Sequence, residues 1–357
     1  MHTQSRPQFK RLIARLTAAA LVMALCACAP LIAPGHAVPK NPYAFQFEEY
    51  WYKFARLYPY FDYKHIDWQA AYDRYRPQAD QVTNELQLVH LLMDMTRPLK
   101  DVHVWFKSPD GDYLTTYDPK RARDPNWNIR VRDLYVPDLA YYGGADWGVG
   151  SIRQFNYLFI SDWKKSALSL DAFVAALQQL HTSPGLIIDV RMNGGGNEDL
   201  AYKIAGFFAD RTHLSEYYRY RNGPEPGDLG PAKPRYLEPA PIVPYRGPIV
   251  LLIGPDSFSS TENFVAAMQT LPNVTTLGAT TGGASGCPES FALRQGWRYS
   301  VPVCFDMTRD HQVIEWNGIR PDIPVPTTLA DFKRGDDPVL DAALKFLRAK
   351  AEARSTS

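Results

Sequence analysis

The sequence predicts an α/β fold with a small helical domain in front of it. Two patterns carry this prediction. From about Trp147 onward, short apolar runs typical of buried strands alternate with helix-like segments. Such alternation favours parallel strands with helices layered on the sheet. Before it, residues 41–108 place apolar and aromatic side chains at three-to-four spacing, the period of a helix.

The helical domain, residues 41–108, is expected to contain three helices, at Phe45–Tyr58, Trp68–Tyr75 and Leu86–Met95. Large aromatic side chains are usually buried or packed against neighbours. We therefore interpret the aromatic residues of this domain as core and packing surface rather than as a ligand cage: Tyr50, Trp51, Tyr52, Phe54, Tyr58, Tyr60 and Phe61.

Residues 109–146 form a polar connecting segment with strand signals near Ile129–Tyr135. The core domain is expected over residues 147–330, and a C-terminal helix and tail over residues 331–357. The segment Glu216–Tyr245 lacks clean periodicity, so it is either a loop that lines a cleft or a solvated connector with an edge strand. The expected core elements are strands at Tyr157–Ser161, Gly185–Asp189 and Ile249–Ile253 and helices at Leu170–Leu180, Leu200–Phe208 and Glu262–Thr270.

Composition narrows the function classes. The 357 residues are 45% hydrophobic, enough for a sizeable packed core. They carry 39 basic and 38 acidic side chains, so net charge attracts neither nucleic acid nor an anionic membrane. The eight histidines are scattered and no HExxH motif occurs, so the sequence predicts no metal site and no cofactor.

The first 28 residues have the pattern of an export signal. Basic residues precede the apolar run Leu16–Leu25, which is too short for an ordinary membrane span. The sequence Leu25-Cys26-Ala27-Cys28 resembles a bacterial lipoprotein signal, in which Cys28 would be acylated; the alternative is an ordinary cleaved signal. Residues 29–40, rich in Pro and Ala, are expected to be a tether. We expect an exported protein, periplasmic or anchored to a membrane only by lipid.

Export would place Cys287 and Cys304 in an oxidising compartment, where a disulfide is allowed. The two cysteines flank Phe291–Val303, which has a turn at Gln295-Gly296 between two strand-like runs. A hairpin there would bring the two sulfurs together. Two buried free thiols are the alternative, since the sequence does not determine the distance between the two Cα atoms.

Two turns have the composition of a hydrolytic site. Gly254–Glu262 follows an apolar strand and opens a helix, so it places serine hydroxyls where free N–H groups and the positive end of the helix dipole meet. Gly194, Gly195 and Gly196 follow a second strand, and without Cβ atoms their amides can approach a ligand closely. The glycine loop is therefore a candidate oxyanion hole.

Four phrases occur together in the order typical of one family: LIIDVRMNGGGN, GPDSFSSTENF, LGATTGGASG and IEWNGIRPDIPV. With the upstream MTRPLKDVHVWF, the chain resembles the tricorn-core and C-terminal-processing serine proteases of the tail-specific superfamily, most closely the tricorn-type branch. The resemblance implies a crotonase-like (ClpP-like) spiral sheet. Relatives commonly carry a PDZ module before the glycine strand; residues 109–146 are too few for one, and no PDZ module is recognisable.

The resemblance also assigns roles. Ser259 matches the nucleophile, and the N–H of Ser260 would join the glycine loop in the oxyanion hole. Processing proteases use a lysine base where this chain has Ala284, whereas the tricorn-type branch uses a histidine and a glutamate, matched here by His103 and Glu315. A carboxylate can orient an imidazole and stabilise its cation.

Each assignment has a structural alternative. Ser259 alone would be a helix N-cap, His103 a core or strand-end histidine, and Glu315 a surface carboxylate. Glu262 is interpreted as a residue that orients the serine turn or caps backbone donors.

The expected function is therefore that of an exported serine peptidase acting on a peptide or protein substrate, without the family's lysine. A catalytically inactive binding or scaffold lipoprotein is one alternative. The acyl-CoA chemistry of other crotonase-like sheets is a second, which export and the serine turn argue against.

Overall fold

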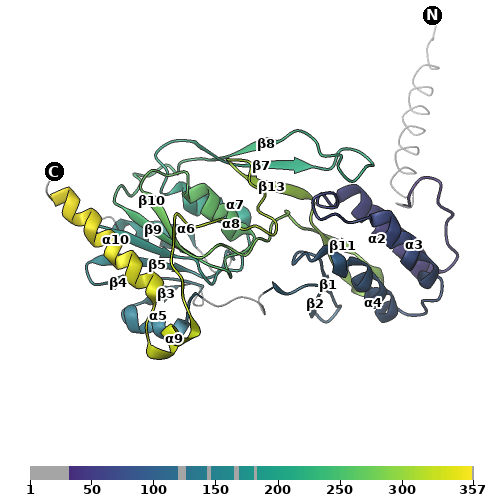
Figure 1. Ribbon diagram of the computed structural model, residues 1–357, viewed down its shortest axis with the longest axis horizontal. Coiled ribbons are helices and arrows are strands. Elements are labelled where there is room, and N and C mark those ends of the chain that lie inside the picture. The colour runs from purple at the N-terminus through teal and green to yellow at the C-terminus, as the bar shows by residue number, and fades with distance from the viewer. Residues whose placement is uncertain (1–31, 120–125, 143–145, 165–168, 181–182, 356–357) are drawn as a thin grey trace, which may run out of the picture. The chain divides into compact units, whose positions relative to one another are not determined.

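The computed structural model describes residues 32–119, 126–142, 146–164, 169–180 and 183–355 (Figure 1). The predicted signal, including Cys28, lies outside these residues. The chain divides into two compact units, one reaching Arg56 and resuming over Trp68–Leu92, the other formed by Leu57–Asp67 and the chain from Met93 onward. In the described part of the chain, no helix combines the length and the apolar character that a bilayer span requires.

The smaller unit confirms the three expected helices. It contains helix α3 (Trp68–Ala79) and most of α2 (Pro42–Leu57) and α4 (Glu85–Thr96). The indole N–H groups of Trp51 and Trp68 each donate to the other residue's carbonyl oxygen, at 3.0 and 3.1 Å. Of the aromatic residues predicted as core, all are buried except Tyr52, which is half-buried. Within the predicted tether, His36 contacts the buried carboxylate of Glu48 at 2.9 Å.

A seven-stranded sheet forms the centre of the larger unit. Its strand order is β14-β10-β9-β6-β5-β4-β3, and β5, β6, β9, β10 and β14 pair in parallel, while β3 and β4 are antiparallel. This confirms the α/β prediction. The strands are β3 (Ala140–Tyr142), β4 (Trp147–Ile152), β5 (Phe155–Ile160), β6 (Leu186–Asp189), β9 (Ile249–Ile253), β10 (Val274–Gly278) and β14 (Ile323–Pro324).

Alternate residues of the parallel strands enter different cores. Leu186 and Ile188 face the core beneath α6 (Leu170–Leu180), α7 (Glu198–Gly206) and α8 (Ser260–Met268), whereas Ile187 faces α10 (Pro338–Ser355). Figure 1 shows α10 in yellow across its own side of the sheet. Both faces are apolar because both are covered, as is usual for parallel strands.

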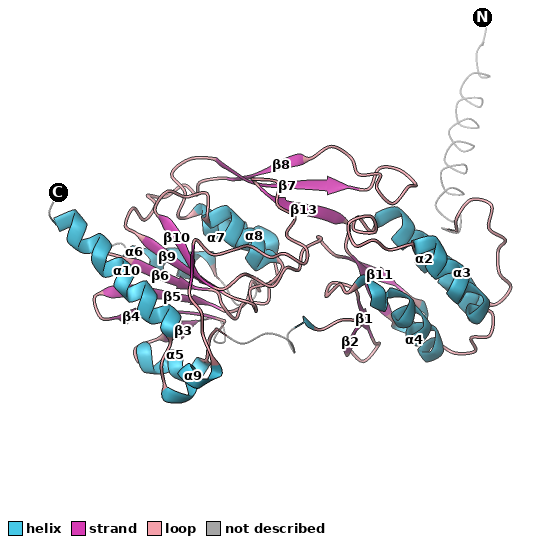
Figure 2. Cartoon of the chain, viewed as in Figure 1, coloured by secondary structure: helices cyan, strands magenta, loops and turns pink. Residues whose placement is uncertain are grey.

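Two smaller sheets complete the larger unit. One has the order β11 (Glu289–Ala292), β12 (Arg298–Val301), β1 (Trp105–Lys107), β2 (Tyr113–Thr115); β11 and β12 form the predicted hairpin, joined by the turn η4 (Arg294–Gly296). The other has the order β13 (Cys304–Thr308), β7 (His213–Tyr220), β8 (Lys233–Leu237), seen as three magenta arrows in Figure 2. Because β8 is an edge strand of this sheet, the structure favours the second alternative for Glu216–Tyr245, a connector with an edge strand.

The strand signal near Ile129–Tyr135 was misleading, because these residues form helix α5 (Ile129–Tyr135). The Asn128 side chain accepts hydrogen bonds from the backbone N–H groups of Arg130 and Val131, which caps the helix. This capping stabilises the helix, although Ile129 and Val131 are β-branched residues that favour a strand. The remaining short helices of the described chain are η1 (Arg97–Leu99) and α9 (Leu329–Arg334).

Candidate active site

Ser259 lies on the turn between β9 and α8. Its φ of 55° is in the region that favours glycine, a conformation that costs free energy and is typical of functional turns. The backbone N–H donates to the carbonyl oxygen of Ala284 (3.0 Å) and to Oε2 of Glu262 (3.2 Å), which hold the turn. The hydroxyl Oγ lies 3.0 Å from Nε2 of His103. The side chain is therefore directed at the histidine.

Glu262 is fully buried under this turn. Besides the N–H of Ser259, its carboxylate accepts from Thr281 Oγ1 (2.6 Å) and from the N–H groups of Gly283 and Ala284 (both 2.8 Å). Burial raises the pKa of Glu262 to about 7, although these donors act in the opposite direction. As predicted from the sequence, Glu262 orients the serine turn, and it joins that turn to residues 281–284.

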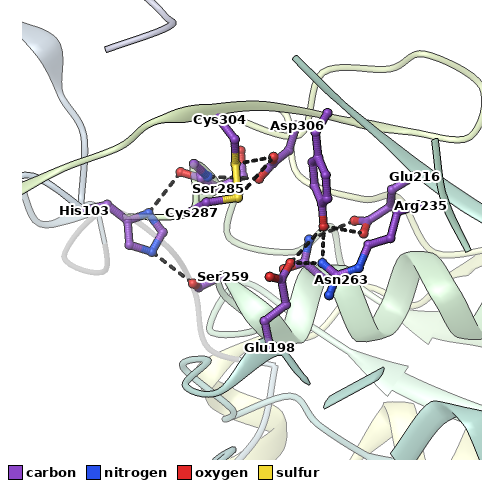
Figure 3. Close-up of a disulfide and its surroundings, with 12 residues drawn as sticks. His103, Glu198, Glu216, Arg235, Ser259, Asn263, Ser285, Cys287, Cys304 and Asp306 are labelled. Carbon is purple, nitrogen blue, oxygen red and sulfur yellow. Dashed lines mark hydrogen bonds and ion pairs between the residues drawn. A yellow bond between two sulfur atoms is a disulfide. The ribbon is translucent and has the colours of Figure 1, made fainter. Parts of the chain in front are cut away.

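His103 lies on the turn before β1. Its Nδ1 is 3.0 Å from the carbonyl oxygen of Ser285 (Figure 3). A carbonyl oxygen can only accept, so Nδ1 carries the hydrogen and Nε2 is left to accept the hydroxyl hydrogen of Ser259. Burial lowers the pKa of His103, which favours the neutral ring. The backbone N–H of His103 donates to Asp101 Oδ1 (2.9 Å), and its backbone carbonyl accepts from the hydroxyl of Ser300 on β12. The hydrogen bond to Ser285 thus defines the tautomer of the ring and leaves Nε2 facing Ser259.

One residue, Ser285, lies between Glu315 and the imidazole. Its Oε2 accepts from the N–H of Ser285 (3.1 Å), whose carbonyl faces His103. The structure therefore brings Ser259 and His103 into contact and places Glu315 behind Ser285. Glu315 is buried, unlike an ordinary surface carboxylate, and burial, followed by the charge of Asp101, raises its pKa to about 8.

Sequence reasoning missed Lys64 and Asp101. Lys64 Nζ donates to Glu315 Oε1 (2.6 Å) and to Asp101 Oδ2 (3.0 Å), and its side chain is fully buried. Asp101 stands two residues before His103 within the histidine motif, a position that could have drawn attention to it. Lys64 had no such signal, because 251 positions separate it from Glu315.

The glycine loop packs directly on Ser259. A Cβ atom at Gly195 would come within 2.8 Å of the Ser259 Cβ, so only glycine fits there. Gly195 was predicted as an oxyanion donor, but its N–H donates to Asn193 Oδ1 (2.9 Å). Within the described residues, the N–H groups of Gly194, Gly196 and Ser260 make no hydrogen bond to protein. These three amides are the remaining candidates for the oxyanion hole.

A disulfide joins Cys287 and Cys304, with the Cα atoms 5.5 Å apart. It stands beside the segment that carries Ser285 (Figure 3), and the Gly286 N–H donates to Asp306 Oδ2 at 2.9 Å. Among the described residues, these two cysteines and Asp306 form the one group with metal-ligand geometry, and the disulfide occupies both sulfurs.

A cavity of about 240 Å³ is lined by Val102, the residue before His103, and by Glu315. Neither this cavity nor a larger one of about 600 Å³ is lined by Ser259 or His103, and the smaller one is the better candidate for a substrate side chain because its lining includes these neighbours of His103. Its lining residues are Lys100, Val102, Tyr117, Pro119, Gly282, Gly283, Glu315 and Trp316.

Comparison with known families agrees with this geometry. The model of peptidase family S41 matches residues 154–325, which include the glycine loop, the serine turn and Glu315, and that of the tricorn protease C1 domain matches residues 39–97. The core of the chain, residues 154–325, thus matches peptidase family S41. The resemblance to tail-specific, tricorn-type proteases is thereby confirmed.

Individual S41 relatives support the same conclusion. Tricorn protease homolog 1 of Streptomyces coelicolor is 29% identical, over 80% of this chain and 33% of the relative. A CtpA-like serine protease of Staphylococcus epidermidis is 21% identical, over 65% of this chain and 44% of the relative. The chain thus spans between a third and a half of these curated relatives.

A solved structure supports the fold. The crystal structure of a Parabacteroides merdae protein assigned as a peptidase has a TM-score of 0.75 and 28% identity, and the match covers 87% of this chain and 97% of that one. The α/β spiral core predicted from the S41 resemblance is confirmed.

Proposed function

We propose that this S41 protein is an exported serine peptidase in which Ser259 is the nucleophile and His103 the base. The observation that carries the proposal is the 3.0 Å contact between Ser259 Oγ and His103 Nε2, with the opposite ring nitrogen donating to Ser285. This contact lies within the reach that proton transfer requires. No lysine takes that position: Ala284 occupies the family's lysine position, and Lys64 Nζ bonds two carboxylates.

In the first half of the reaction, Ser259 Oγ attacks the carbonyl carbon of a peptide bond while its proton passes to His103 Nε2. The negative charge that develops on the substrate oxygen is held by free N–H groups of the glycine loop and of Ser260. The C–N bond then breaks, and the leaving amine takes the proton from Nε2. An acyl-enzyme on Ser259 remains.

In the second half, water attacks the acyl carbon and gives its proton to Nε2, and the proton returns to Oγ as the acid product leaves. The imidazolium formed in each half is stabilised by the Ser285 carbonyl dipole and by the negative charge of Asp101. Glu315 supports the base through Ser285, whose N–H donates to it.

A fluorophosphonate probe tests this proposal, since only an activated serine is phosphonylated. The wild type is expected to be labelled, and Ser259→Ala and His103→Ala to be silent. Ser290→Ala, on the exposed strand β11, is the control and should label like the wild type. A substrate-profiling digest with wild type and Ser259→Ala in parallel would then define the peptide sequences cleaved. A folded wild type that neither labels nor cleaves peptides would favour the inactive binding or scaffold protein.

We also propose export with acylation at Cys28. The support is the basic start, the short apolar run and Leu25-Cys26-Ala27-Cys28 in the sequence, together with a disulfide suited to an oxidising compartment. Intact mass of the mature protein from a bacterial membrane fraction should show loss of residues 1–27 and one lipidated cysteine. Cys28→Ser should abolish the lipid, and an unmodified N-terminus beyond residue 28 would contradict the proposal.

A further inference from the structure

Lys64 is a buried cation with a complete set of partners. Its ammonium group lies between Asp101 Oδ2 (3.0 Å) and Glu315 Oε1 (2.6 Å). Three rings surround it, with centroids 5.6 Å (Tyr58), 5.3 Å (Tyr60) and 4.9 Å (Trp316) from Nζ. Although burial opposes the charge, the two carboxylates raise the pKa of Lys64, so the lysine is protonated and cannot serve as a base.

Each carboxylate bound by Lys64 also holds a peptide group next to the imidazole. Asp101 Oδ1 accepts from the N–H of His103 itself (2.9 Å). Glu315 Oε2 accepts from the N–H of Ser285 (3.1 Å), the residue whose carbonyl receives the ring N–H. The two carboxylates stand on different segments of the chain, and the ammonium group of Lys64 joins them.

We propose that Lys64 is a positioning residue for the reaction: it ties the turn that carries His103 to the segment that carries Ser285, and thereby fixes the tautomer and direction of the imidazole. This inference rests on the proposed function. It assigns a task to a lysine that touches neither the nucleophile nor the base. The charged and titratable groups that face Lys64 are Asp101, Glu315, Tyr58 and Tyr60.

Charge is essential to this role. Without Lys64, Asp101 and Glu315 would form a buried pair of like charges, which is costly unless one takes up a proton. In both cases the ammonium group, which is the common donor that joins the two segments, is absent. The Ser285 carbonyl would then no longer be held opposite Nδ1, so His103 could turn or exchange its tautomer.

The decisive experiment is a ¹⁵N NMR titration of the His103 ring, assigned by comparison with His103→Gln. The wild type should show hydrogen on Nδ1 and titrate below the ordinary histidine range. Lys64→Met should populate both tautomers and titrate at higher pH, because the nearby carboxylates lose their cation. Lys164→Met, which removes an exposed lysine paired with Asp162, is the matched control and should leave the His103 titration unchanged.

Fluorophosphonate labelling of the same proteins adds a kinetic readout. Lys64→Met should slow labelling at least about ten-fold, as expected when a catalytic base loses its alignment. Lys64→Arg keeps the charge and should recover part of the rate. If the wild type itself is not labelled, the proposed function fails, whereas the NMR titration still decides the role of Lys64.

An unchanged tautomer and titration in folded Lys64→Met would overturn the proposal. If that variant does not fold, Lys64→Met combined with Asp101→Asn removes the unpaired charge and decides the question. Mixed tautomers in this double variant support the tie between the two segments. A double variant with the wild-type titration and labelling rate would mean that Lys64 only neutralises Asp101, and the proposal would be wrong.

Discussion

The molecule contains two buried clusters in which one cation lies between two carboxylates. In one, Lys64 bonds Asp101 and Glu315; in the other, Arg191 bonds Asp189 and Asp337, with Nη2 2.7 and 2.9 Å from their Oδ2 atoms. All six side chains are almost completely excluded from solvent. The two clusters have the same charge composition but different surroundings.

The arginine cluster is fully structural. Arg191 bonds Asp189 through two nitrogens and also donates to the Asn126 carbonyl, while Asp337 Oδ1 accepts from the first amides of α10. The planar fork serves several acceptors at once. Although burial opposes ionisation, Arg191 lowers the pKa of Asp189. The cluster thus joins the end of β6 to the start of α10.

The lysine cluster has the same charges but a cation of different shape. Lys64 is one compact charge for two carboxylates, and the pKa of Glu315 rises to about 8. Both carboxylates also accept from backbone N–H groups, Asp101 from that of His103 and Glu315 from that of Ser285, whose carbonyl faces the His103 ring. We therefore expect the lysine cluster to affect the proposed reaction through these backbone groups and the arginine cluster to affect stability, and four predictions test this difference.

The largest effect is expected at the catalytic pair itself. Ser259→Ala and His103→Ala should each lower turnover by about 10³-fold or more, because neither residue can form the acyl-enzyme alone. The double variant should be little worse than either single variant. Peptide-hydrolysis kinetics on the three proteins measure this. Losses that multiply in the double variant, or a His103→Ala protein with near-normal turnover, would contradict the assignment.

Removing the cation of the arginine cluster should lower the stability of the protein and leave the titration of His103 unchanged. Arg191→Met leaves two buried carboxylates without a cation, so the free energy of unfolding should fall by about 3–5 kcal/mol. Urea denaturation followed by tryptophan fluorescence measures it. In the protein that remains folded, the His103 titration should match that of the wild type. A shifted titration would show that the two clusters are not separate.

The disulfide should contribute less than the arginine cluster. Cys287→Ser with Cys304→Ser opens a link between residues 17 positions apart, and should lower the free energy of unfolding by about 3 kcal/mol. Denaturation of the double variant and of the reduced wild type should agree. Because the link adjoins Ser285, we also expect slower fluorophosphonate labelling, and an unchanged rate would show that hydrogen bonds alone hold that segment.

The smallest effect is expected in the pH at which the labelling rate falls on the acid side. The base must be neutral, and burial lowers the pKa of His103, so the labelling rate should fall as pH decreases through a midpoint below 6.5. The rate should stay high above this midpoint. Labelling rates between pH 4.5 and 7.5 measure it, with Lys164→Met as reference. A midpoint above 6.5 would mean that the carboxylates outweigh burial at this histidine.

Local patterns in the sequence were sufficient for the first three helices and for β5, β6 and β9 at the centre of the large sheet. The alternation of apolar runs with helical segments predicted the parallel strands, because burial on both faces requires continuous apolar side chains. The serine turn and the glycine loop were candidates because each combines a strand end with a turn of special composition, whereas His103 was assigned through the family resemblance. Local signals failed at Ile129–Tyr135, where the Asn128 cap decides for a helix.

The tertiary structure alone decided how the base is supported. It placed the Ser285 carbonyl at Nδ1 of His103, placed Glu315 at the N–H of the same residue, and brought Lys64 between Asp101 and Glu315. A sequence shows neither a backbone carbonyl as a hydrogen-bond partner nor a contact between residues 251 positions apart. The physical reason is that these interactions depend on distances between separate segments, which are set only when sheets and turns pack together.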